Sequence, residues 1–138
     1  MLEIETLHHV ALPVTDLDRS KRFYTEVLGL REIDRPPFDF PGCWFQLGDR
    51  QLHLIQREDG SVRRGRGVDS RDIHFAVRVR SWRQALEALR SQGYGEDRDN
   101  ADLLKMKVSA GARAGFPQIF VLDPDRHVIE INAARGDE

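Results

Sequence analysis

Two short stretches of sequence decide the fold: HVALPV at His9–Val14 and HFAVRV at His74–Val79. The second copy begins 65 residues after the first and keeps the same His, Ala and final Val. Side chains in both stretches alternate between two sides, which predicts β-strands. A repeat of this kind indicates a chain built from two similar halves.

A helical pattern follows each predicted strand. In the first half, Thr15 or Asp16 can cap a helix that ends before Gly29. In the second half, Ser81 can cap a helix with apolar residues at helical spacing, and Gly93 follows it. Each half therefore begins with a strand and a helix in the same order.

The two halves also end alike. Residues 45–55 read FQLGDRQLHLI and residues 120–131 read FVLDPDRHVIEI, and each segment predicts two strands joined by a turn. We expect one α+β domain over residues 1–138. It consists of a βαβββ module at 5–56, a linker at 57–70 and a second βαβββ module at 71–133.

Two connecting segments show no periodic spacing of apolar residues. Residues 60–70 are rich in Gly and Arg, which predicts a solvated, mobile linker, with an anion-binding flap as the alternative. Residues 92–116 predict a polar loop and an edge strand over residues 104–108. A loop of this length beside a site often serves as a lid.

The composition is that of an ordinary soluble domain, which we expect in the cytoplasm. The chain of 138 residues is 40% hydrophobic and 32% charged, with 21 basic and 23 acidic side chains and a net charge of -2. Neither nucleic acid nor a membrane is expected as a partner. The single cysteine excludes an intrachain disulfide and a zinc cluster of thiolates.

Four possible metal ligands occupy matching places in the two halves. His9 and His74 open the first strand of each half, and His53 and Glu130 lie within the last strand. Three imidazoles and one carboxylate suit Zn, Ni, Mn, Fe or Co and not calcium. In a five- or six-coordinate ion, four protein ligands leave one or two positions for water or substrate. A single His on a strand is more often a surface residue, so the prediction depends on the shared register.

Side chains near these ligands are candidates for contacting a substrate: Trp44, Arg57, Gln118 and Phe120. Core packing is the alternative for the two aromatic residues, and simple solvation is the alternative for Arg57. Glu130 is the candidate catalytic residue, acting as a general base if it leaves the metal when the substrate binds.

The sequence resembles the vicinal oxygen chelate superfamily, also called the glyoxalase/bleomycin resistance/dioxygenase superfamily. The motifs are LHHVALPVTDLDRSKRFYTEVLGL at 7–30, FDFPGCWFQLGDRQLHLIQ at 38–56, DIHFAVRV at 72–79 and FVLDPDRHVIEI at 120–131. The resemblance covers nearly the whole chain. It implies paired βαβββ modules whose curved mixed sheets surround a metal, with ligands at His9, His53, His74 and Glu130. It also implies a homodimer, often with ligands shared between subunits.

The resemblance implies a metal-dependent enzyme whose small substrate is chelated through vicinal oxygens, with lyase, isomerase or thiol-transferase chemistry. The alternatives are a resistance protein that binds a small molecule or drug without turnover, and an Fe(II) extradiol dioxygenase. Glyoxalase I usually has an acidic or amide ligand where this chain has His53, and often an Arg where it has Pro13. The substrate, the reaction and the metal stay open at this point.

Overall fold

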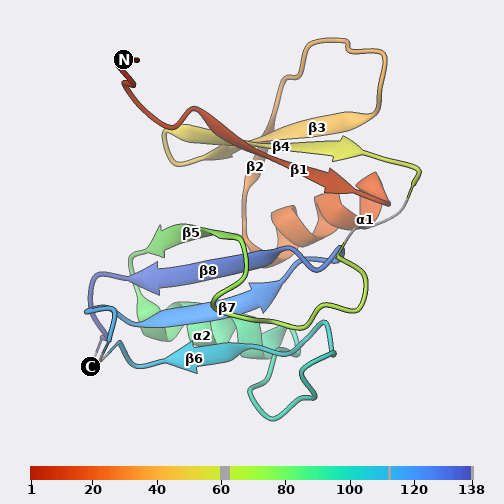
Figure 1. Ribbon diagram of the computed structural model, residues 1–138. Coiled ribbons are helices and arrows are strands. Elements are labelled where there is room, and N and C mark those ends of the chain that lie inside the picture. The colour runs from red at the N-terminus through yellow and green to blue at the C-terminus, as the bar shows by residue number, and fades with distance from the viewer. Residues whose placement is uncertain (60–62, 112, 138) are drawn as a thin grey trace. The chain divides into compact units, whose positions relative to one another are not determined.

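The computed structural model describes residues 1–59, 63–111 and 113–137. The chain divides into two compact units, Met1–Ser61 and Val62–Glu138. Each unit holds one four-stranded mixed sheet and one helical segment (Figure 1). The predicted pair of tandem βαβββ modules is confirmed.

The first unit is built from β1 (His9–Val14), β2 (Arg31–Ile33), β3 (Gly42–Leu47) and β4 (Arg50–Gln56). The strand order is β1-β4-β3-β2, with β1 and β4 parallel and the other pairs antiparallel. One face of the sheet is apolar and packs with the helical segment. The core residues of this unit are Val14, Phe23, Tyr24, Cys43, Phe45, Leu52 and Leu54.

The second unit repeats this topology with β5 (His74–Val79), β6 (Lys107–Ser109), β7 (Gln118–Leu122) and β8 (Val128–Ala133). Its order is β5-β8-β7-β6, again with a parallel first pair. The repeat also holds at the level of register. Ala11 lies opposite His53 on β4, and Ala76 lies opposite Glu130 on β8.

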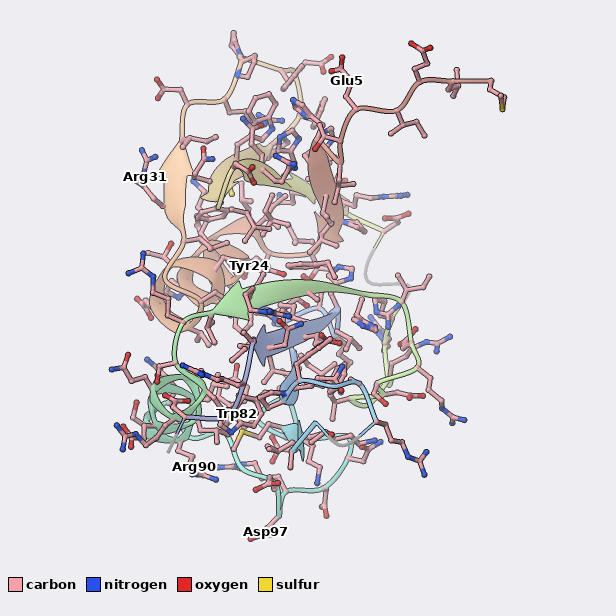
Figure 2. All side chains as sticks on the ribbon, turned by 90° about the vertical axis from the view of Figure 1, so that its left-hand side faces the viewer. Glu5, Tyr24, Arg31, Trp82, Arg90 and Asp97 are labelled. Carbon is pink, nitrogen blue, oxygen red and sulfur yellow. The ribbon has the colours of Figure 1, made fainter. Side chains whose placement is uncertain are left out.

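The helices begin where the sequence predicts. Asp16 accepts a hydrogen bond from the Arg19 backbone N–H, and Ser81 accepts one from Gln84. In the first unit α1 (Leu17–Arg22) continues into a π-helical turn, η1 (Phe23–Val27). This change of helix type was not predicted. In the second unit α2 (Trp82–Ser91) carries Trp82 and Arg90, and Asp97 lies in the loop after it (Figure 2).

The predicted edge strand at residues 104–108 is displaced toward the C-terminus. The strand β6 covers only Lys107–Ser109, because the Lys105 backbone N–H donates to Asp102 in a turn. Lys105 pairs only through an isolated bridge with Gly95.

The predicted solvated linker is wrong for Arg63 and Val68, whereas residues 64–66 and Ser70 are exposed. Residues 60–62 lie outside the described residues. From Arg63 onward the segment packs against the second unit, with Val68 fully buried beside Phe120 and Val128. Arg63 also forms an ion pair with Asp72, and both side chains are only 12% exposed. We call residues 63–72 the strap.

Candidate metal and substrate site

The first unit brings two of the predicted ligands into direct contact. His9 on β1 and His53 on β4 point to the same face of the sheet, and their rings stack with centroids 4.0 Å apart. Trp44 on β3 lies opposite His53 and stacks on it almost in parallel, also at 4.0 Å. Because β4 lies between β1 and β3, the His53 ring is held between two aromatic neighbours.

The environment of His53 keeps its imidazole neutral. Burial, and to a smaller extent the nearby His9, His8 and Arg35, together lower the pKa of His53 to about 4. The His53 Nε2 donates to the Gln51 side-chain oxygen at 2.9 Å, which leaves the lone pair on Nδ1. A neutral imidazole with a free lone pair is the form that binds a metal.

The second unit brings together the other two predicted ligands. The His74 Nδ1 donates to the Asp72 carbonyl oxygen at 2.8 Å, so the lone pair of a neutral His74 lies on Nε2. That Nε2 lies 3.4 Å from the Glu130 Oε1. Phe120 packs edge-on against the His74 ring, with centroids 5.5 Å apart.

This spacing fits a cation bound by both side chains. A proton on the His74 Nε2 and a bound metal ion would each supply the positive charge that attracts the Glu130 carboxylate oxygen at this distance. Ligand atoms at about 2.0–2.2 Å from a metal ion lie roughly 3.0–3.4 Å from one another, from octahedral to tetrahedral geometry. The distance between the His74 Nε2 and the Glu130 Oε1 lies at the upper end of this range.

Two amides fix the Glu130 carboxylate, which is only 6% exposed. The Gln118 Nε2 donates to Oε1 at 2.9 Å, and the Asn132 Nδ2 donates to Oε2 at 2.5 Å. The Asn132 oxygen in turn accepts from the Arg78 Nε at 2.5 Å. Each carboxylate oxygen has two lone pairs, so both oxygens keep capacity for a further partner.

The comparisons with known proteins agree with the motifs. Residues 6–131 match the family model of the Glyoxalase/Bleomycin resistance protein/Dioxygenase superfamily. The chain belongs to this superfamily.

Two relatives illustrate how far the similarity extends. The lactoylglutathione lyase of Salmonella typhimurium is 30% identical over 139 residues, which cover 94% of this chain and 93% of that protein. The lactoylglutathione lyase of Arabidopsis thaliana is also 30% identical, over 131 residues and 89% of this chain. This chain spans only 42% of that plant protein's length.

A glyoxalase family protein from Bacillus anthracis has the same fold. Its crystal structure superposes with a TM-score of 0.74 at 21% identity, over 96% of this chain and 98% of that one. No helix in the described part of this superfamily member is long and apolar enough to cross a membrane.

The four predicted metal ligands lie in two pairs, one pair in each unit. Among the described residues, no three His, Cys, Asp or Glu side chains form a group that could hold a metal. Trp44, Gln118 and Phe120 each contact one of the four ligands. Arg57 does not. It follows the end of β4 and forms an exposed ion pair with Asp59 at 2.7 Å.

Several contacting residues were missed by the sequence analysis. Gln51 and Asn132 each lie two residues from a predicted ligand on the same strand, and strand alternation alone could have placed them on the same face. His8 is exposed, but its Nδ1 lies 2.8 Å from the His9 Nδ1, and no signal in the sequence indicated that contact.

Cys43 is not suited to act as a nucleophile. Burial raises the pKa of the Cys43 thiol to about 11, so the thiol stays protonated and unreactive at neutral pH.

Proposed function

We propose that this protein is a metal-dependent enzyme of the glyoxalase type. In this proposal His9, His53, His74 and Glu130 hold one divalent ion, and a small substrate binds the ion through neighbouring oxygens. The observation that carries the proposal is the matched register of the two ligand pairs. Ala11 lies opposite His53 and Ala76 opposite Glu130, with His9 and His74 two residues earlier on their strands.

The donor set also supports the proposal. His53 is neutral at pH 7 because burial lowers its pKa to about 4. The hydrogen bond from the His74 Nδ1 to the Asp72 carbonyl directs the His74 Nε2 toward Glu130. Metal-binding imidazoles typically donate their second nitrogen to a carbonyl or carboxylate in this way.

The reaction class we favour is a lyase or isomerase reaction that moves a proton next to a carbonyl. A bound divalent ion would supply Lewis-acid stabilisation of negative charge developing on the substrate oxygens. Glu130 would accept the proton at Oε2, which keeps a second lone pair beside its bond from Asn132. Gln118 and Asn132 would hold the carboxylate in one orientation while the proton moves.

The relatives make a lyase the favoured reaction. Two proteins named lactoylglutathione lyase are 30% identical to this chain. Thiol-transferase chemistry and ligand binding without turnover are the competing outcomes of the test below.

The test is metal content measured by mass spectrometry on purified protein reloaded with Zn, Ni, Mn, Fe or Co. We expect about one equivalent of metal per chain in the wild-type protein, and we expect this metal to be lost in His74→Ala and in His9→Ala. The control is His127→Gln, which removes a histidine outside the proposed ligand set; His127 lies just before β8 and is buried, so the folding of this variant is checked as well.

Circular dichroism would establish that each variant is folded. A wild-type protein that binds none of the five ions would overturn the proposal and favour the role of a ligand-binding protein. Metal that persists at full occupancy in folded His74→Ala would overturn the assigned ligands.

A further inference from the structure

The two sheets differ at one row of the register, next to the proposed ligands. In the second unit this row runs across four strands as Arg78, Asn132, Gln118 and Ser109, and every residue in it can form hydrogen bonds. The corresponding row of the first unit is Pro13, Ile55 and Gly42. The second unit therefore has a polar row at a position where the matching row of the first unit has none.

Arg78 is the cation in this row, and its guanidinium is held in place from two sides. Its Nε donates to the Asn132 oxygen at 2.5 Å, and its Cζ lies 5.1 Å from the centre of the Phe116 ring. A guanidinium has five N–H donors, and Nε supplies only one of them. Among the described residues, the two terminal nitrogens of Arg78 have no hydrogen-bond partner.

The side chains around Arg78 connect it to the proposed ligands. Asn132 bridges the Arg78 guanidinium and the Glu130 carboxylate, so one carboxamide separates the two groups. On β5, only the methyl group of Ala76 lies between His74 and Arg78 on this face. Two residues along a strand cover about 6.6 Å, so the Arg78 row lies about that far from the Glu130 row and about twice as far from His74 along β5.

We propose that Arg78 binds an anionic group of the substrate, a carboxylate or a phosphonate, at the end of the substrate away from the chelated oxygens. The planar fork of an arginine suits either oxyanion. Because the first unit has Pro13 at the matching position, the substrate would lie with its charged end over the second unit. This inference rests on the proposed function, since the metal would hold the other end of the substrate.

The test uses three hydroxamate-type chelators that bind a metal through the same pair of oxygens. Glutaric acid monohydroxamate carries a carboxylate, its terminal amide is the neutral isostere, and 3-(N-hydroxyformamido)propylphosphonate carries a phosphonate. Titration calorimetry on the metal-loaded protein gives the affinity of each compound.

We expect wild-type protein to bind at least one charged compound about tenfold to a hundredfold more tightly than the neutral amide. Arg78→Gln would remove this preference and change the affinity for the neutral amide by less than about twofold. Arg78→Lys would keep part of the preference for the charged compounds, because the positive charge remains while the planar set of N–H donors is lost. The control is Arg83→Gln, which removes one charge from the exposed part of α2.

The outcomes separate this inference from the proposed function. If wild-type protein binds the neutral amide as tightly as the charged compounds, Arg78 does not bind an anion. The same conclusion follows if Arg78→Gln still binds the charged compounds more tightly than the neutral amide. If Arg78→Gln weakens all three compounds equally, Arg78 acts by holding Asn132 and Glu130, and the inference is overturned. If none of the three binds the wild-type protein, the proposed function fails and this inference fails with it. The stronger of the two charged compounds identifies the anion as carboxylate or phosphonate.

Discussion

His53 is the most constrained of the proposed ligands, because its neighbours determine both its charge and its orientation. It lies between Trp44 and His9 in the strand order, and Gln51 fixes its tautomer. A buried imidazole with a pKa of about 4 binds fewer protons than the same residue in the unfolded chain between about pH 4 and 6.5. The unfolded state is therefore favoured by acid in this range.

The first prediction concerns the titration of His53. In Trp82→Phe, Trp44 is the remaining tryptophan, and its stacking on His53 makes its fluorescence report the charge of that ring. We expect the fluorescence to change with a midpoint near pH 4 and not near 6.5. His53→Gln in the same background would abolish the transition, and a midpoint near 6.5 would contradict the buried, neutral state of His53.

The same shift has a consequence for stability with a definite sign. The folded pKa of His53 is lower than the unfolded pKa, so the stability from the neutral ring is complete above about pH 6.5 and is lost toward pH 4. A shift of this size corresponds to a loss on the order of 3 kcal/mol in the free energy of unfolding. Urea unfolding of metal-free wild type and His53→Gln between pH 4 and 7 would show a steeper dependence in the wild type.

At the scale of elements, the strap shows where sequence patterns stop being informative. Its Gly and Arg content is typical of a solvated segment, yet Val68 is fully buried and Arg63 is nearly so. One apolar residue gives no periodicity, and the partners of Arg63 lie at Asp72 and at the Arg126 carbonyl, 63 residues away. Contacts of that kind depend on tertiary structure and leave no local signal.

The strands were predictable because their signal is local. Alternation is a local property, and the repeat of HVALPV and HFAVRV showed which strands correspond. The same alternation placed His9, His53, His74 and Glu130 on the strand faces where their pairs meet. Of the amides that orient them, Gln118 was predicted, whereas Gln51 and Asn132 were missed although the same alternation places them on the ligand face.

The second prediction is that the strap supports the fold through the Arg63–Asp72 ion pair. Burial raises the pKa of Asp72, but the Ile73 backbone N–H and the Arg63 guanidinium outweigh it, so the pKa lies below its usual range. Arg63→Gln would lower the free energy of unfolding by about 2 kcal/mol at pH 7. Arg66, 3.8 Å from the Asp72 carboxylate, would compensate in part.

The pH dependence of this variant has a definite sign. Because the folded pKa of Asp72 is lowered, the ion pair contributes fully above the unfolded pKa of about 3.9 and is lost as the pH falls through the folded value. The difference between wild type and Arg63→Gln should therefore shrink in acid. Urea unfolding at pH 7 and pH 3 would measure it, with Arg64→Gln as the control on an exposed neighbour. An unchanged difference at pH 3 would show that Asp72 is not the partner that matters.

At the scale of the whole molecule, the division of ligands between two units has a thermodynamic consequence. Each unit supplies two donors, and a pair of donors alone binds a divalent ion more weakly than four. The proposed site therefore couples the two units. Any metal-dependent stabilisation should require ligands from both, since a ligand that binds only the folded protein stabilises it by mass action.

The final prediction asks whether the two donor pairs of one site come from the same chain. In a homodimer with shared ligands, His9 and His53 of one subunit would meet His74 and Glu130 of the other, as the resemblance to the superfamily implies. A heterodimer of His9→Ala and His74→Ala chains would then contain one site with both substitutions and one fully intact site. Unfolding and refolding an equal mixture of the two variants should restore about a quarter of the wild-type metal content, because about half of the dimers are mixed.

The arithmetic of this mixture makes the result decisive. If all four ligands came from one chain, every site in the mixture would lack one histidine, and mixing would restore no metal. Each variant refolded alone provides the baseline, and a double variant carrying both substitutions on one chain, mixed with wild type, is the matched control. With shared ligands, the mixed dimers of that control have one substitution at each site and bind no metal, so only its wild-type homodimers do, and its total is also about a quarter of the wild-type content. With all four ligands from one chain, the control keeps about half of the wild-type metal and the first mixture has none. The two mixtures contain the same substitutions in the same amounts, so equal metal contents indicate shared ligands and unequal contents indicate ligands from one chain.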